Sequence, residues 1–174
     1  MGQAGFSMLE VMLVMVVMTL AVSMLSSTIT STAKMGTLQL ENSVASEAAR
    51  ERLEYMRIQT FGELFARFNT EPADDPGGPG TAPGAHFPVP GLTPREGDAD
   101  GMCGHIRFPE DFGELRESTF DEKLGMPRDL NLDGKISFSD VADSYQLLPV
   151  EIQIQWESRG IPREFLVHGV YVKH

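Results

Sequence analysis

The chain begins with a long apolar stretch. Residues 6–25 consist mostly of Val, Leu and Met, and residues 21–29 extend this run. Because about 20 consecutive apolar residues suffice for a helix to cross a bilayer, we expect residues 6–29 to form a transmembrane helix. Glu10 lies near the start of the run. A charged side chain is costly within a membrane span and is usually functional there, so Glu10 is a candidate functional residue. The alternative is a flanking charge that is tolerated because it reaches the membrane interface.

Residues 30–70 carry a different pattern, in which polar positions separate apolar ones at helical spacing. Residues three and four apart share one face of a helix. The pattern therefore predicts an amphipathic helix that continues from the apolar one into a head. The apolar stripe consists of Ala45, Ala49, Leu53, Met56, Leu64, Phe65 and Phe68. We expect a C-terminal sheet to cover it.

The rest of the chain divides into a loop and a β-rich head. Residues 71–97 are rich in proline and glycine, which predicts an irregular loop. Residues 98–174 are expected to form the head, in which residues 103–108 suggest a short strand that ends at Pro109. These patterns predict an α+β fold, with one long N-terminal α-helix packed on a small C-terminal antiparallel β-sheet.

The end of the chain predicts a hairpin. Residues 149–157 alternate strictly between apolar and polar, as in a strand with one buried face. The side chains expected to face the helix are Val150, Ile152, Ile154 and Trp156. Residues 158–162 predict a turn and residues 163–173 an antiparallel partner strand. Its inward side chains are expected to be Phe165, Val167, Val170 and Val172, with Gly169 as a candidate bulge.

Residues 129–140 predict a calcium site. Oxygen-bearing side chains occupy positions 1, 3, 5, 9 and 12 of this segment, and Gly134 occupies position 6. This is the ligand spacing of an EF-hand loop, and the segment also resembles dockerin-type loops, which accept Asp at position 12. The expected ligands of the Ca²⁺ ion are the side chains of Asp129, Asn131, Asp133 and Asp140 and the carbonyl of Lys135.

The role of this loop has two interpretations. A single loop favours a structural calcium ion, which would neutralise carboxylates and stabilise the head. The competing interpretation is an acidic Asx-turn that holds no metal. In the calcium interpretation, Ile136 is expected to pack into the core.

The N-terminal residues resemble those of type IV pilins and pseudopilins. The shared features are Gly5 followed by Phe6, the acidic Glu10 four residues later, and the unbroken apolar helix. The resemblance implies that residues 1–5 are a leader and that a prepilin peptidase cuts between Gly5 and Phe6. It further implies methylation of the new Phe6 amine, a pilin-like fold and assembly through the N-terminal helix.

The resemblance also implies a function. A minor pilin or pseudopilin rests in the inner membrane with its head outside the cytoplasm, and then joins other pilin subunits in a filament. There, Glu10 would accept an ion pair from the methylated Phe6 amine of a neighbouring subunit. The filament can belong to a secretion system, a pilus or a DNA-uptake apparatus, and the sequence does not distinguish them.

Composition argues against several further kinds of function and site. With 14 basic and 25 acidic residues, the formal net charge is −11, which argues against nucleic-acid binding through a basic face. Cys103 is the single cysteine, so no intrachain disulfide can form. The histidines His86, His105, His168 and His174 lack metal-ligand spacing along the chain, which argues against a catalytic zinc.

Three other interpretations compete with a filament subunit. A membrane-anchored, calcium-binding recognition module would never polymerise. A secretory signal peptide would be cut near residues 21–23, although the chain lacks the basic residues that open such a signal. An anchored enzyme would need a catalytic constellation, and the sequence suggests no catalytic residue. We therefore expect a non-enzymatic, structural protein.

Overall fold

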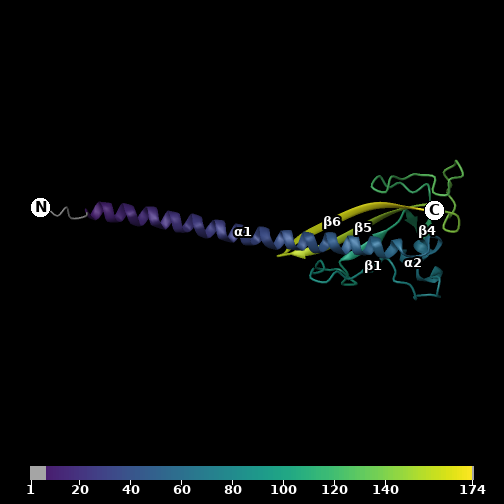
Figure 1. Ribbon diagram of the computed structural model, residues 1–174, viewed down its shortest axis with the longest axis horizontal. Helices are drawn as coiled ribbons and strands as arrows, with labels where there is room; N and C mark the ends of the chain where they lie inside the picture. Colours follow the sequence, from purple (N-terminus) through teal and green to yellow (C-terminus); the bar gives the residue numbers. More distant parts are fainter. Residues whose placement is uncertain (1–6, 174) are drawn as a thin grey trace. The chain divides into compact units, whose positions relative to one another are not determined.

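The computed structural model describes residues 7–173. The chain divides into two compact units, Met1–Leu40 and Glu41–His174. Helix α1 (Met8–Arg57) supplies the regular structure of the first unit and continues into the second (Figure 1). The processing residues Gly5 and Phe6 lie outside the described residues.

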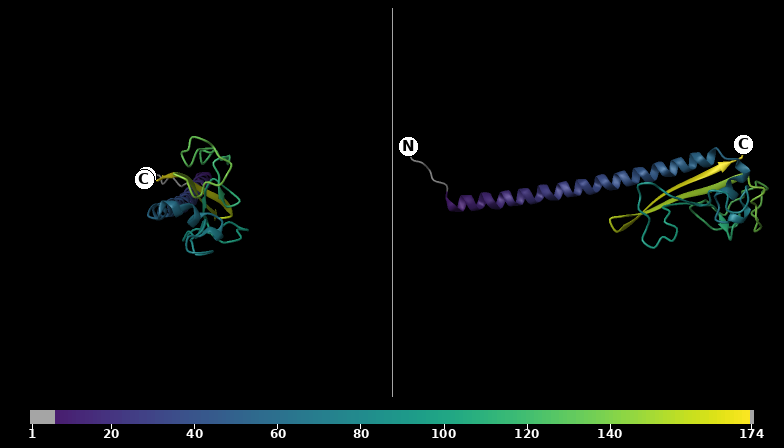
Figure 2. Two further views of the ribbon diagram at one scale, coloured as in Figure 1. Left: turned by 90° about the vertical axis from the view of Figure 1, so that its right-hand side faces the viewer. Right: turned by 90° about the horizontal axis from the view of Figure 1, so that it is seen from below.

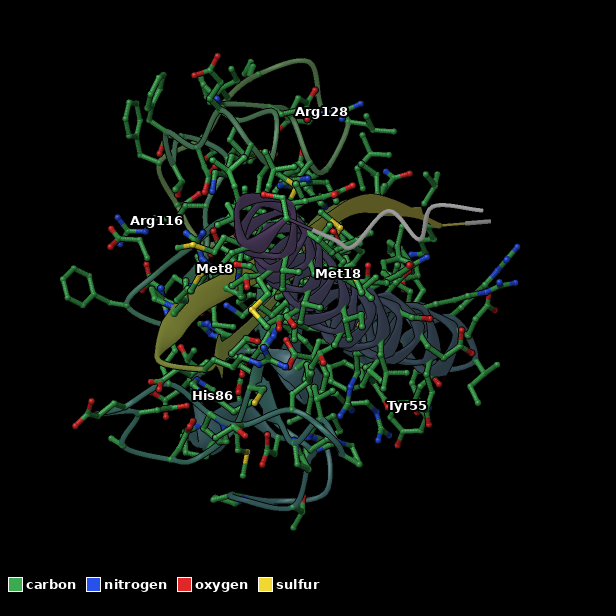
Figure 3. All side chains as sticks on the ribbon, turned by 90° about the vertical axis from the view of Figure 1, so that its left-hand side faces the viewer. Met8, Met18, Tyr55, His86, Arg116 and Arg128 are labelled. Carbon is green, nitrogen blue, oxygen red and sulfur yellow. The ribbon has the colours of Figure 1, made fainter. Side chains whose placement is uncertain are left out.

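The first unit is an exposed apolar helix. Every side chain from residue 7 to residue 36 is exposed, including Met8 and Met18, which are labelled in Figure 3. Four threonine hydroxyls in this segment donate hydrogen bonds to the carbonyl four residues earlier, at 2.7–3.0 Å. These bonds satisfy the hydroxyls within the helix, which suits apolar surroundings.

Helix α1 is long and apolar enough to cross a membrane. Among residues 7–173 it is the one helix that meets both requirements, and none of its most apolar window is buried. It is therefore compatible with a single-pass membrane anchor. A signal sequence near the N-terminus satisfies the same requirements.

The second unit is built on a four-stranded antiparallel sheet with strand order β1-β2-β5-β6. The strands are β1 (His86–Phe87), β2 (Gly104–Arg107), β5 (Leu147–Ser158) and β6 (Ile161–Val172). Strands β5 and β6 form the long hairpin that the sequence predicts, and they run beside the last turns of α1 (Figure 2). A smaller sheet pairs β3 (Glu110–Asp111) with β4 (Glu114–Leu115).

The core lies between the sheet and the part of α1 that belongs to the head. Its helical members include Ala45, Ala49 and Met56, and its strand members include the predicted set Val150, Ile152, Ile154 and Trp156. All of these side chains are buried. The apolar stripe of the helix thus packs against the alternating apolar residues of β5, as the sequence predicts. The protein is α+β, with one long apolar N-terminal helix and a small antiparallel sheet.

The amphipathic helix is shorter than the sequence predicts. Helix α1 ends at Arg57, and the 3₁₀ helix η1 (Phe61–Glu63) and the short helix α2 (Leu64–Phe68) follow. The break does not expose the apolar stripe, because Leu64, Phe65 and Phe68 are buried from α2. A second 3₁₀ helix, η2 (Pro72–Asp74), and strand β1 both lie within the segment expected to be irregular.

The expected bulge at Gly169 is wrong, and this changes which side chains face the core. The pairing of β5 with β6 is unbroken from Leu147↔Val172 to Ser158↔Ile161, and Gly169 pairs with Val150. Without a bulge the faces alternate regularly, so Tyr171 packs against the core while Val170 and Val172 are each 46% exposed.

Candidate functional site

Glu10 lies in the first turn of α1 and is exposed. Its backbone N–H donates to the carbonyl of Ser7 at 2.9 Å. Glu10 and Lys34 are the only charged residues between residues 7 and 40. Lys34 lies 24 residues further along the helix, which is too far to pair with Glu10 at a rise of about 1.5 Å per residue. Within residues 7–40, therefore, no side chain of opposite charge reaches Glu10.

The predicted calcium loop turns its side-chain oxygens inward. The Asp129 carboxylate accepts hydrogen bonds from the backbone N–H groups of Asp133 at 3.2 Å and Gly134 at 2.7 Å. The Asn131 side-chain oxygen also accepts from the Asp133 N–H, at 3.0 Å. The Asp133 carboxylate accepts from the Lys135 N–H at 2.8 Å. Three of the predicted ligand side chains therefore gather around one short backbone segment.

Glycine is required at the centre of this loop. Gly134 has a φ of +84°, in the left-handed region that residues with a Cβ rarely adopt. The Gly134 N–H donates to the Asp129 carboxylate within the same turn. The position-6 glycine of the sequence pattern thus has the backbone role that the pattern implies.

Glu117 holds the loop from outside it. Its side chain is fully buried, and one carboxylate oxygen accepts from the N–H groups of Leu130 and Asn131 at 2.8 and 3.1 Å. The other oxygen accepts from the Ser137 N–H at 2.7 Å. Because three N–H groups satisfy this buried carboxylate, Glu117 ties both ends of the loop together. Sequence reasoning missed Glu117, since its contacts span 13 to 20 residues.

Asp140, at position 12, has backbone partners outside the loop. Its Oδ1 accepts from the N–H groups of Leu115 at 3.1 Å and Ala142 at 2.9 Å. It also forms a β-bridge with Arg116, which Figure 3 labels. The other carboxylate oxygen, Oδ2, is the atom of Asp140 that can serve a metal ion.

The expectation that Ile136 packs into the core is wrong. Ile136 is 47% exposed, whereas Leu130, in the second position of the loop, is fully buried. The Leu130 carbonyl accepts from the N–H groups of Gln146 and Leu147 at 2.7 and 2.9 Å. These bonds tie Leu130 to the start of β5, so Leu130 provides the apolar anchor of the loop.

The residues present fit a calcium ion in chemistry. Calcium prefers hard oxygen ligands, namely carboxylates, amide oxygens and main-chain carbonyls, and Asp129, Asn131 and Asp133 supply the first two kinds. Within residues 7–173, no group of three or more His, Cys, Asp or Glu side chains is arranged to hold a metal ion. The loop contributes three carboxylates, Asp129, Asp133 and Asp140, beside the amide of Asn131. One oxygen of Asp140 is already held by backbone N–H groups.

The structure also brings together two histidines that the sequence separates. His86 on β1 and His105 on β2 face each other as Cα partners. Burial, together with the nearby charges of His86 and Arg107, lowers the pKa of His105 to about 4. The His105 imidazole is therefore neutral at physiological pH. Spacing along the sequence carries no trace of this pair, because strand pairing alone creates it.

Comparison of the chain with known proteins identifies no relative. No protein-family model, no curated protein and no solved structure matches it.

Proposed function

We propose that this protein is a structural subunit of a filament of the type IV pilus or type II secretion kind. The observation that carries the proposal is helix α1. Its first part is apolar and exposed and bears Glu10 in its first turn, while its last turns form part of the core of a separate head. One helix thus combines a segment made for apolar surroundings with a segment fixed in a folded domain.

The exposed apolar segment needs a cover outside this chain. None of its most apolar window is buried, and apolar surface of this extent is stable only in a membrane or against other apolar helices. In the proposed cycle the helix rests in the inner membrane, with the head outside the cytoplasm. It then moves into a filament core where helices of several subunits pack together.

Glu10 gives the proposed assembly its register. An unpaired carboxylate in an apolar core is costly, whereas a paired one is tolerated. The family resemblance supplies the partner, the methylated amine of Phe6 on a neighbouring subunit after a prepilin peptidase has cut behind Gly5. A subunit in the wrong register would leave Glu10 without that amine.

In the proposed subunit, the head also binds a structural calcium ion. Asp129, Asn131, Asp133 and the Lys135 carbonyl would hold the ion, with Asp140 as the position-12 ligand. The ion would neutralise carboxylates in a chain with a formal net charge of −11. The buried carboxylate of Glu117 supports this role, because it fixes the backbone on which the ligands sit.

The test is mass spectrometry of the intact protein and its N-terminal peptide, extracted from its native membrane. The proposal expects a chain that begins with N-methylated Phe6. A chain that still begins with Met1, or that is cut near residue 23, would overturn it. The head would then be an anchored or secreted calcium-binding module that does not polymerise.

A further inference from the structure

His86 and His105 form a close cross-strand pair on β1 and β2. The Ile106 N–H donates to the Ala85 carbonyl at 2.7 Å, which places His86 and His105 at a pair position without mutual backbone hydrogen bonds. Side chains at such positions lie closest together in an antiparallel sheet. The two imidazole rings accordingly have centroids 4.3 Å apart and planes inclined by 34°.

A carboxylate orients one of the two rings. The Nδ1 atom of His86 contacts the Asp100 carboxylate, whose Oδ1 in turn accepts from the Met102 N–H at 2.9 Å. Histidines that bind metals through one nitrogen commonly donate the other N–H to a carboxylate in this way. The contact with Asp100 leaves Nε2 of His86 available.

The pair borders an acidic groove of about 300 Å³. Its lining includes three acidic side chains, Glu96, Asp98 and Asp100, and one basic side chain, Arg95. Arg95 is engaged with the side-chain oxygen of Gln155 at 2.8 Å. A groove with an excess of carboxylates raises the local concentration of cations. His86, labelled in Figure 3, lines this groove and keeps 45% of its side chain exposed.

We propose that His86 and His105 bind a divalent transition-metal ion, of the class of Zn²⁺ and Cu²⁺, through one ring nitrogen each. Imidazole favours these metals over Ca²⁺ and Mg²⁺. Two nitrogens on a tetrahedral zinc lie about 3.3 Å apart. The His105 ring would turn about its Cβ–Cγ bond to direct one nitrogen at an ion bound by Nε2 of His86. Asp100 holds His86 in place, and water fills the remaining positions.

This site has two protein ligands and does not depend on the proposed filament function. It differs in chemistry from the calcium loop, whose ligands are all oxygens. The expected role is binding of a metal from the surroundings of the head, because two ligands and an exposed ring leave the ion accessible.

The experiment is calorimetric titration of Zn²⁺ into the full chain, without a histidine tag, in detergent micelles and with saturating Ca²⁺ present throughout. We expect one site per chain. The variants His86→Gln and His105→Gln should each weaken Zn²⁺ binding by tenfold or more, and Asp100→Asn by about 10- to 100-fold. His168→Gln is the matched control, because His168 lies on β6 of the same sheet and contacts Glu151 instead.

Two results would overturn the proposal. One is Zn²⁺ affinity in the double variant His86→Gln/His105→Gln equal to that of the unmodified chain. The other is an equal loss of affinity in His168→Gln.

Electron paramagnetic resonance of bound Cu²⁺ gives a second measurement. Hyperfine structure from two equatorial nitrogens supports the site, and a spectrum with oxygen ligands alone contradicts it. Circular dichroism of each variant verifies that the head remains folded.

Discussion

The indole Nε1 of Trp156 donates a hydrogen bond to the Glu41 carboxylate at 3.1 Å. Trp156 is only 1% exposed, so its N–H has no ready access to water. Glu41 is the first residue of the second unit. The bond therefore joins the strand β5 to the turn of α1 where the helix enters the head.

Removing the acceptor should destabilise the head. In the variant Glu41→Ala, the buried indole N–H loses its partner, which costs about 1–3 kcal/mol. Glu47→Ala is the matched control, since Glu47 is exposed on the same helix. Chemical denaturation of the full chain in detergent, followed by near-ultraviolet circular dichroism, measures the difference. Equal unfolding free energies for the two variants would show that the bond contributes nothing.

Gly104 should not tolerate a methyl group. A Cβ at this position would lie 2.4 Å from the ring of Phe87, and Phe87 is buried with the Arg52 guanidinium 4.1 Å from its ring centroid. The ring has little room to move, so Gly104→Ala should destabilise the head by about 1–3 kcal/mol.

A thermodynamic cycle tests the cause of this loss. In a Phe87→Leu background the aromatic ring is gone, and Gly104→Ala should then cost less than in the unmodified chain. Gly62→Ala serves as the control, because no atom lies within 4 Å of its added Cβ. If Gly104→Ala costs the same with and without the ring, the close contact with Phe87 is not the reason.

Glu110 should make stability depend on pH. Burial, together with the nearby charge of Asp74, raises the pKa of Glu110 above its ordinary value of 4.5. The hydrogen bond from Thr70 acts in the opposite direction but is outweighed. One of its carboxylate oxygens is buried without a hydrogen-bond partner. The folded state therefore holds the proton more tightly than the unfolded state, so this group stabilises the fold at low pH. Its contribution is lost as pH rises through the folded-state pKa.

The variant Glu110→Gln removes the free-energy cost of holding an ionised carboxylate at this partly buried position. At pH 7 we expect it to be more stable than the unmodified chain, by a small margin because Glu110 is only partly buried and solvent screens its charge. The advantage should shrink as pH falls toward 4. Glu122→Gln, at an exposed position, should show no such trend. Denaturation curves at several pH values measure the difference in unfolding free energy between Glu110→Gln and the unmodified chain. A difference that does not vary with pH contradicts the explanation.

Removal of calcium should lower the melting temperature of the head. A ligand present at 100 times its Kd stabilises the folded state by about 2.7 kcal/mol, which corresponds to a shift in Tm on the order of 10 °C. Asp133→Asn should abolish the difference between calcium and chelator. Asp140→Asn retains an oxygen for the Leu115 and Ala142 amides, so it should reduce the calcium effect and preserve the calcium-free Tm. A calcium effect unchanged in Asp133→Asn would exclude the loop as its source.

The sequence predicted those features of the fold that depend on periodicity. The helical spacing of Ala45, Ala49 and Met56 and the alternation from Val150 to Trp156 both report a buried face, and both faces are buried as expected. The expectation that Val170 and Val172 face the core is wrong, because it depends on a bulge at Gly169. Gly169 instead pairs in register with Val150, and local sequence does not distinguish these two uses of glycine.

In the candidate sites, too, local contacts could be predicted from the sequence and long-range contacts could not. The local pattern of residues 129–134 was enough to expect converging oxygens, because those contacts span two to five residues. The anchor Glu117 and the pair of His86 with His105 depend on chain segments that only the tertiary fold brings together. No periodicity or spacing encodes such contacts.

Glu10 provides the sharpest test of the proposed assembly. Glu10→Leu removes the only acidic side chain between residues 7 and 40, which makes the segment more apolar, so membrane insertion should persist. Filament incorporation should fall at least tenfold, because the neighbouring Phe6 amine would then be buried without a partner. Met12→Leu, a change of similar position but without charge, is the control. Membrane fractionation and quantification of the subunit in sheared filaments measure the two steps separately. Normal incorporation of Glu10→Leu alongside Met12→Leu would refute the register argument, and apolar packing of α1 alone would then have to account for assembly.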